Sequence, residues 1–288
     1  MAKKQKSKSN NFEDRLVDLY DIDEPTILTL YGRSGSGKTT ISGTLPKPIF
    51  FIDVKDKGTL SARNKLRVKR GDIQVFSLKN FDDIYEAYDY LIENTDKFKS
   101  VVIDHLTALQ ELGNEKVRAE EGKDQMSQRM FGNTANYMKE VINLYKELNE
   151  EGILPCFIVQ DRLESGDGEG EDQLMPEVGP GLMPSVSKYL CAVSRVIGHT
   201  YLYEHSEKEG MKVKKEIQYR LRLGPNPYYI TKFTRPQGSE CPSYLVHDLK
   251  APTTIWEDIE TILAGEWSND KPVKSGKKPG KKSGKKKK

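Results

Sequence analysis

Residues 32–39 of this chain read Gly-Arg-Ser-Gly-Ser-Gly-Lys-Thr, which matches the pattern GxxxxGK[ST] at every constrained position. The glycines allow the backbone to curl, so that successive N–H groups point at one bound phosphate. In this pattern the lysine reaches the β- and γ-phosphates of a nucleotide, and the hydroxyl that follows it ligates Mg²⁺. We therefore predict a phosphate-binding loop (P-loop) that binds ATP together with Mg²⁺. The residues predicted to bind this cofactor are Gly32, Arg33, Ser34, Gly35, Ser36, Gly37, Lys38, Thr39 and Thr40.

The residues on either side of the octet support this prediction. Residues 26–31 are apolar and β-branched, which is typical of a buried strand. Residues 39–45 can form a first helix that stops at Pro46, and its positive end would face the bound anion. A chance match in a Gly/Ser surface turn would not require a strand before it and a helix after it.

Apolar runs of strand length alternate with helical stretches along most of the chain. This alternation is typical of an α/β fold with a mostly parallel central sheet flanked by helices. Three later segments have the character of strands in an antiparallel extension, and a closing helix is expected at 252–263. The predicted strands are 49–53, 72–76, 100–104, 153–160, 195–203, 213–223 and 228–234, and the predicted helices include 81–92 and 133–148.

Asp104 is the first candidate partner of the loop. It ends the apolar run Val101–Ile103, and in P-loop enzymes a carboxylate at such a position lies beside the loop and holds Mg²⁺. We expect Thr39 and Asp104 to be the protein's metal ligands. The competing interpretation is a strand-end aspartate that caps the next helix.

Charge is distributed unevenly along the 288 residues, although the net charge is only +3. Residues 1–10 carry four lysines and residues 271–288 carry ten, with no acid in either segment. Removing these 14 lysines from the 46 Lys and Arg leaves 32 basic residues against 43 acidic ones, a net charge of −11. The C-terminal segment should be disordered and could act as a nonspecific arm for nucleic acid, as a solvating tail, or as a partner for the acidic body.

Composition indicates a cytoplasmic protein. No run approaches the ~18 apolar residues that a membrane span needs, so we expect no membrane association. Cys156, Cys191 and Cys241 are far apart and odd in number, which is typical of reduced thiols in a reducing compartment.

The order of four segments resembles that of the RecA-like P-loop ATPases, and more narrowly that of phage-encoded RecA-like proteins, some of which act in single-strand annealing. The segments are the P-loop, residues 51–54, residues 102–109 and residues 157–160. The resemblance covers about residues 25–235 and implies domains at 1–20 (a basic flexible lead-in), 21–265 (a RecA-like ATPase domain) and 266–288 (a disordered Lys-rich tail).

The same resemblance implies roles for residues beyond the loop. Gln160 would sense the γ-phosphate, or it is an ordinary polar residue at a strand end. Lys232 and Arg235 would act across a subunit boundary on a neighbour's nucleotide, as an arginine finger does, or they are exposed strand-end cations. The implied assembly is a homo-oligomer, located in the host cytoplasm if the chain is phage-encoded.

Two departures from the family pattern bear on catalysis and DNA binding. Lys55 occupies the position of the family's catalytic glutamate, so Asp56 or Asp53 would have to replace it. Residues 164–172, which follow Gln160, are acidic and would repel phosphates at a place where the family contacts single-stranded DNA.

We therefore expect an ATPase of DNA recombination, repair or single-strand annealing that binds single-stranded DNA partly through its basic tails. The alternative is a nucleotide-switched interaction protein that hydrolyses ATP weakly or not at all and docks on a replication or recombination partner. A small-molecule kinase fits less well, because no arginine-rich lid is evident.

Overall fold

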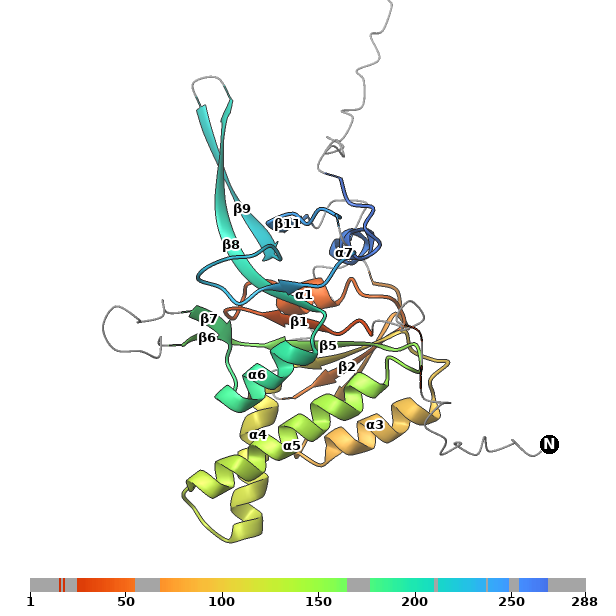
Figure 1. The fold of residues 1–288 in the computed structure, drawn as a ribbon, viewed down its shortest axis with the longest axis vertical. Coiled ribbons are helices and arrows are strands. Elements are labelled where there is room, and N and C mark those ends of the chain that lie inside the picture. The colour runs from red at the N-terminus through yellow and green to blue at the C-terminus, as the bar shows by residue number, and fades with distance from the viewer. Residues whose placement is uncertain are drawn as a thin grey trace, which may run out of the picture.

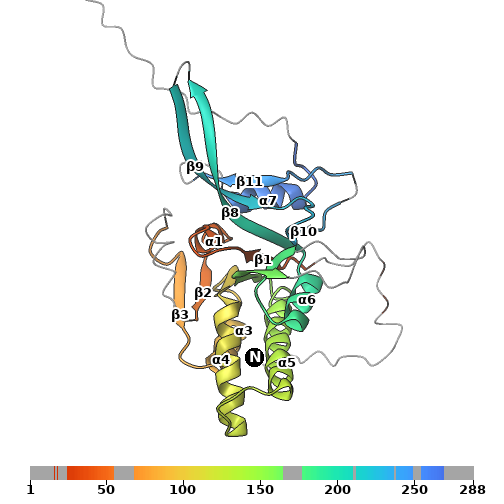
Figure 2. The ribbon, with the colours of Figure 1, turned by 90° about the vertical axis from the view of Figure 1, so that its left-hand side faces the viewer.

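The computed structural model describes residues 16, 18, 25–54, 68–164, 177–209, 212–236, 238–248 and 254–268. Within them a nine-stranded sheet has helices on both faces (Figures 1 and 2). The strands are β1 (Leu28–Tyr31), β2 (Ile49–Asp53), β3 (Ile73–Ser77), β4 (Ser100–Asp104), β5 (Leu154–Val159), β8 (Val196–Glu209), β9 (Lys212–Arg222), β10 (Lys232–Phe233) and β11 (Tyr244–His247). The helices are α1 (Lys38–Ser42), α3 (Asp83–Glu93), α4 (Leu106–Glu121), α5 (Gln128–Glu147), α6 (Pro184–Val193) and α7 (Ile255–Leu263), and β6 (Asp161–Glu164) pairs with β7 (Glu177–Pro180) in a separate ribbon.

The sheet has the order β11-β9-β8-β1-β5-β4-β2-β3, with β10 also paired to β8. All pairings from β8 through β3 are parallel, whereas β9, β10 and β11 pair antiparallel. The predicted fold class is therefore confirmed: an α/β domain with a mostly parallel sheet and a late antiparallel extension. None of the described helices is both long enough and apolar enough to cross a membrane.

The central strands are apolar because helices cover both of their faces. Every residue of β1 and β2 is buried, and so are the first four residues of β4. Parallel strands in this position carry continuous apolar runs rather than alternating patterns. That is why 49–53 and 100–104 were predicted with the bounds that the structure shows.

Two apolar layers hold the helices to the sheet. On one face lie α3, α4, α5 and α6, and on the other lie α1 and α7 (Figure 2). The amphipathic α5 buries Met138, Val141 and Tyr145, and the Tyr145 hydroxyl donates a hydrogen bond to Ile84 O of α3 at 2.8 Å. Burial of side chains of this size stabilises the fold by about 1.5–3 kcal/mol each.

The long hairpin β8–β9 projects from the body of the protein (Figure 1). Its antiparallel character confirms the predictions for 195–203 and 213–223. The predicted strand 228–234 is wrong in its first part, because Tyr228 N donates to Asn226 Oδ1 in a local turn and only Lys232–Phe233 joins the sheet. Helices α4 and α6 and the strands β6, β7 and β11 were not predicted.

His199 lies at the base of this hairpin and is only 5% exposed. Its ring stacks on Tyr229 at 4.3 Å and on Tyr201 at 5.7 Å between centroids, and Tyr31 lies at 5.0 Å. Burial, with a smaller contribution from nearby Arg222, lowers the pKa of His199 to about 4. The imidazole is therefore neutral in the folded protein at neutral pH.

We expect the free energy of unfolding to fall by about 2 kcal/mol when the pH is lowered from 7 to 5. Over this range His199 becomes protonated in the unfolded chain but stays neutral in the folded chain. The sign follows from the lowered folded pKa: stability is lost as the pH falls from the ordinary value of about 6.5. Urea denaturation at both pH values measures the change. His199→Asn should be less stable at pH 7 but should show a smaller pH dependence. An unchanged pH dependence in His199→Asn would contradict this assignment.

Candidate nucleotide-binding site

Three strand ends bring the predicted nucleotide site together. The P-loop follows β1, Asp104 ends β4, and Gln160 follows β5, which lies between those two strands and is parallel to both. The carboxyl ends of parallel strands meet at one edge of a sheet, where ligands of α/β proteins commonly bind. The structure therefore places these predicted residues at the same edge although they are far apart in the sequence.

The loop itself has the backbone conformation that its glycines allow. Gly35 and Gly37 have φ angles of +79° and +98°, a region that other residues adopt rarely. A Cβ on Gly32 would lie 2.4 Å from Thr200 O, so the loop packs directly on β8. Ser36 Oγ and Thr200 Oγ1 are 2.6 Å apart and share a hydrogen bond, which holds the loop against the same strand.

Lys38 is positioned over the loop that precedes it. Its Nζ donates to Gly32 O at 2.6 Å and to Arg33 O at 2.9 Å, and the residue is only 8% exposed. Burial lowers the pKa of Lys38, against the attraction of Asp104 and Asp161. A buried ammonium held mainly by neutral carbonyls is suited to an anionic ligand, because a nearby negative charge offsets the cost of desolvation.

Thr39 and Asp104 meet as predicted. Thr39 Oγ1 donates to Asp104 Oδ2 at 2.7 Å, and burial raises the pKa of this carboxyl even though the Thr39 hydrogen bond and Lys38 lower it. A hydroxyl and a carboxylate side by side are the oxygen ligands that Mg²⁺ takes in nucleotide sites, so these residues fit that ion. The alternative prediction, that Asp104 caps the next helix, is wrong. The N-cap residue of α4 is His105, whose Nδ1 accepts a hydrogen bond from Ala108 N at 3.0 Å.

Gln160 lies beside the Asp104 strand end. Its backbone N donates to Thr107 Oγ1 at 3.2 Å, and its Nε2 lies 3.4 Å from His105 Nε2. The side chain is exposed at this edge of the sheet. The position is compatible with a γ-phosphate sensor, and that role stays a prediction.

Lys232 and Arg235 are not at this chain's own loop. Strand β10 pairs with Val196 and Ile197, which lie opposite the first residues of β1, at the end of that strand away from the P-loop. Lys232 Nζ donates to Cys191 O at 3.2 Å and to Ala192 O at 3.0 Å, near the C-terminal end of α6. Arg235 is exposed. Their predicted action across a subunit boundary stays a prediction.

Four residues at the site were missed by the sequence analysis or given no firm place. Asp161 Oδ2 lies 3.9 Å from Arg33 Nε. The Tyr219 ring packs against Gly37, so closely that a Cβ added to Gly37 would lie 3.0 Å from the ring atom Cδ1. Asp53 is 5% exposed and pairs in register with Asp104. With Thr200, these residues come from strands up to about 180 positions from the loop, and no local pattern in the sequence connects them to it.

Several predicted features lie outside the described residues. These are Lys55 and Asp56, nearly all of the acidic segment 164–172, most of the lead-in at 1–20, and residues 269–288 of the tail.

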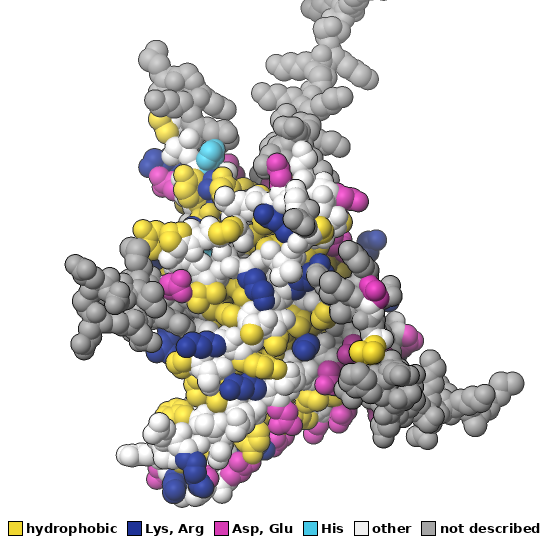
Figure 3. All heavy atoms as spheres, in the orientation of Figure 1, with side chains coloured by type: hydrophobic (Ala, Val, Ile, Leu, Met, Phe, Trp, Pro, Cys, Tyr) yellow, Lys and Arg dark blue, Asp and Glu magenta, His cyan; other side chains and the backbone are white. Residues whose placement is uncertain are grey.

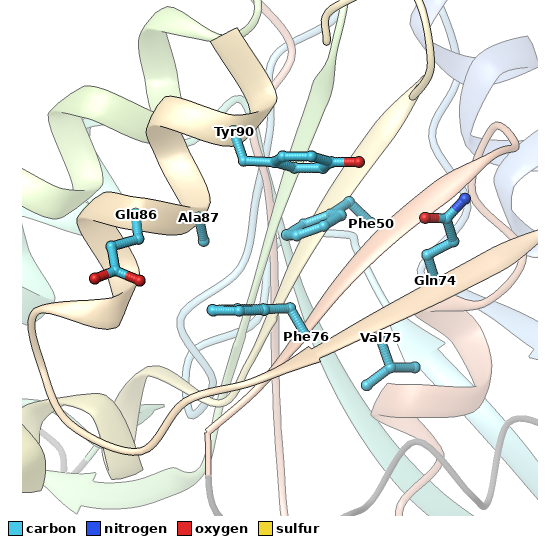
Figure 4. A pocket seen from close by; sticks show the side chains of 7 residues that line it. All are labelled: Phe50, Gln74, Val75, Phe76, Glu86, Ala87 and Tyr90. Atoms are coloured by element: carbon cyan, nitrogen blue, oxygen red, sulfur yellow. The ribbon is translucent and has the colours of Figure 1, made fainter. Parts of the chain in front are cut away.

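A separate cavity of about 290 Å³ lies between α3 and the strands β2 and β3. Its walls include three rings, those of Phe50, Phe76 and Tyr90, which lie one above another in Figure 4. It is mostly apolar and is formed by other elements than the phosphate loop. We therefore assign it no part in nucleotide binding.

We expect Lys38→Ala to abolish ATP binding, because this change removes the cation that lies over the loop. Fluorescence titration with a labelled ATP analogue measures the affinity. Lys116→Ala is the matched control: this lysine binds Asp82 at 2.7 Å, and its loss should leave the affinity unchanged. Wild-type affinity in Lys38→Ala would refute the assignment of the loop.

A family model described as an AAA domain matches residues 24–229. Among solved structures, a KaiC-like protein from the hyperthermophilic archaeon Pyrococcus horikoshii matches with 12% identity and a TM-score of 0.43, over 78% of this chain and 90% of that one. No curated protein matches the sequence. The family match covers more than half of the chain and includes the P-loop, so this protein belongs to the AAA-domain family, and its core is a P-loop ATPase domain.

Proposed function

We propose that this protein is an oligomeric RecA-like ATPase that acts on single-stranded DNA in phage recombination, repair or annealing. The observation that carries the proposal is the convergence of Lys38, Thr39, Asp104 and Gln160 at one sheet edge. Phosphoryl transfer depends mainly on positioning and on stabilising charge, which is what these groups can supply.

Each residue would have a distinct task on ATP. The loop N–H groups and Lys38 would hold the phosphates, and Thr39 and Asp104 would hold Mg²⁺, which when bound neutralises phosphate charge. Gln160 would orient the attacking water at the γ-phosphate. In hydrolysis the water oxygen bonds to the γ-phosphorus, the bond to the β–γ bridging oxygen breaks, and a carboxylate takes the proton of the water.

The identity of that carboxylate decides how fast the chain turns ATP over. Lys55 cannot serve as a base in place of a glutamate, which leaves Asp53 and Asp56. Asp53 is buried at the end of β2, next to Asp104 in register. A carboxylate at this position would lie close to the proposed metal ligands, where a proton acceptor for the attacking water is needed.

The proposed DNA ligand is supported by the lysine-rich segment 271–288, whose charge would attract a polyanion. Lys232 and Arg235 lie away from this chain's own loop, so a role for either of them on ATP would require the nucleotide of a neighbouring subunit and therefore an oligomer. The alternative function is a nucleotide-switched protein that docks on a replication or recombination partner. It is favoured by Lys55 and by the acidic body, whose net charge outside the two lysine-rich ends is −11.

ATPase activity measured with and without single-stranded DNA, together with the mass of the assembly, separates these functions. We expect an oligomer whose turnover rises when DNA is added, because DNA and ATP would bind to the same ordered state. Asp104→Asn should lose turnover in both conditions. Tight ATP binding without turnover, with or without DNA, would favour the switch, and a monomer would refute the shared site.

Mixing two inactive variants tests whether the site is shared. Lys38→Ala damages the loop and Lys232→Ala removes the proposed finger, so each homo-oligomer should be inactive. In an equal mixture, random assembly restores both groups at about a quarter of the interfaces, and about that fraction of wild-type turnover should return. The same mixture made with Arg235→Ala tests the second candidate. Activity of the Lys232→Ala and Arg235→Ala homo-oligomers equal to wild type would rule out the finger.

A further inference from the structure

One face of the antiparallel extension is built from tyrosines and arginines. The register places Tyr201 opposite Arg220 on β9, and Arg222 opposite Tyr244 on β11. Directly paired residues point to the same side of a sheet, as do residues two positions apart on one strand. Tyr201, Tyr203, Arg220, Arg222 and Tyr244 therefore share one side, which we call the tyrosine–arginine face.

The side chains of this face form two diagonal rows. In one row the Arg220 guanidinium carbon lies 3.6 Å from the centre of the Tyr203 ring and 4.1 Å from that of Tyr244. In the other row Arg222 lies 4.8 Å from the Tyr201 ring and 4.4 Å from the Tyr229 ring. Each guanidinium is thus held between two tyrosine rings, an arrangement that fixes the positions of both partners.

The two arginines have no counter-ion among the described residues. Arg220 is only 7% exposed, and its Nε and Nη2 both donate to the neutral Gln218 Oε1, at 3.1 and 2.8 Å. Arg222 Nε is buried and has no hydrogen-bond partner among the described residues. No described carboxylate lies within 4.0 Å of either guanidinium. A buried donor and an unpaired cation carry a desolvation cost that an anionic ligand would offset.

The rings, in contrast, are open to solvent. Tyr203 is 43% exposed and Tyr244 is 40% exposed, although each has Arg220 against one side. Figure 3 shows hydrophobic side chains, a class that includes tyrosine, gathered over the projecting hairpin and its base. Flat rings held at an open surface are the platforms on which unpaired bases stack, and stacking tolerates any base sequence.

This face is also connected to the nucleotide site. Thr200, which lies between His199 and Tyr201 on β8, donates to Tyr31 O at 3.1 Å and bonds Ser36 of the P-loop. Tyr229 pairs with Val178 of β7, and the carbonyl of Val178 accepts from the Tyr31 hydroxyl at 3.0 Å. A change in the loop on binding a nucleotide would therefore reach the same strands that carry the rings.

We propose that the tyrosine–arginine face binds single-stranded DNA, with bases stacked on Tyr203 and Tyr244 and phosphates drawn to Arg220 and Arg222. This inference rests on the proposed function, and it assigns the DNA contact to a place other than the lysine tail. Duplex DNA does not fit as well, because its bases are stacked on one another and the arginines, held between rings, cannot extend into a groove.

The full chain and a fluorescein-labelled oligothymidine provide the test, by fluorescence anisotropy at several salt concentrations. Tyr203→Ala and Tyr244→Ala should each weaken binding about tenfold, since a stacked base contributes this order of affinity. Tyr203→Phe and Tyr244→Phe keep the ring and should bind within about twofold of wild type. Tyr90→Ala removes a ring of equal exposure, 40%, from the distant α3 and serves as the control that should not change DNA affinity.

A photochemical readout separates contact from indirect structural effects. An oligonucleotide that contains 5-iodouracil should cross-link to Tyr203 or Tyr244 on irradiation, and peptide mapping identifies the site. The affinity for labelled ATP in the absence of DNA should be unchanged in the alanine and phenylalanine variants of Tyr203 and Tyr244, which would show that the loop is intact. Cross-links confined to other regions would overturn the proposal.

The remaining outcomes distinguish this inference from the proposed function. Wild-type affinity in both alanine variants, with binding lost on removal of residues 271–288, would overturn the inference and leave the proposed function standing. An equal loss of single-stranded and duplex DNA binding in the alanine variants would exclude stacking and also overturn it. Absence of any DNA binding by the wild-type chain at low salt would overturn both.

Discussion

The hydrogen bond from Thr39 to Asp104 joins the two parts of the protein on which nucleotide chemistry depends. Thr39 lies in the first turn of the helix after the P-loop, and Asp104 ends a strand that is not a neighbour of β1. The bond can form because β5 lies between these strands and all three run parallel, so that their ends meet at one edge. The same arrangement places Gln160 and Asp53 beside the pair. Loss of any of these strands from its place would separate groups that must act within a few ångströms of one phosphate.

The P-loop is also held from its other side, by β8. The contact between Ser36 and Thr200, together with the close approach of Gly32 to Thr200, makes the long hairpin part of the nucleotide site's support. The opposite side of the same strand carries the tyrosine–arginine face. One strand therefore has an ATP-loop contact on one side and the proposed DNA contact on the other. A short, packed connection of this kind is a physical basis for coupling between two ligands, since both would bias the same element.

Prediction from sequence succeeded where burial determined the pattern. The strands 49–53 and 100–104 are covered on both faces and show the predicted bounds, and α5 has the predicted periodicity although it begins five residues earlier. Prediction failed where tertiary contacts decided the local structure. Helix α4 has a mixed polar composition and is stabilised by its cap and by packing against α5. Residues 228–231 are aromatic and β-branched but are held in a turn and a single bridge. Local composition could not reveal either case, because the contacts that decide it come from distant segments.

The sequence by itself determined the phosphate loop, because the octet's glycines and Lys38 are required by the local chemistry of phosphate binding, and it determined Asp104 as a candidate partner. It also determined the class of fold, since the alternation of buried strands and amphipathic helices leaves few other arrangements. Only the tertiary structure decided that Lys38 is buried over its own loop and that Thr200 and Tyr219 of the hairpin pack against that loop. It also decided that two arginines lie between tyrosine rings. The reason is physical: these contacts join residues on different strands, and the sheet register that brings them together is set by packing of the whole domain.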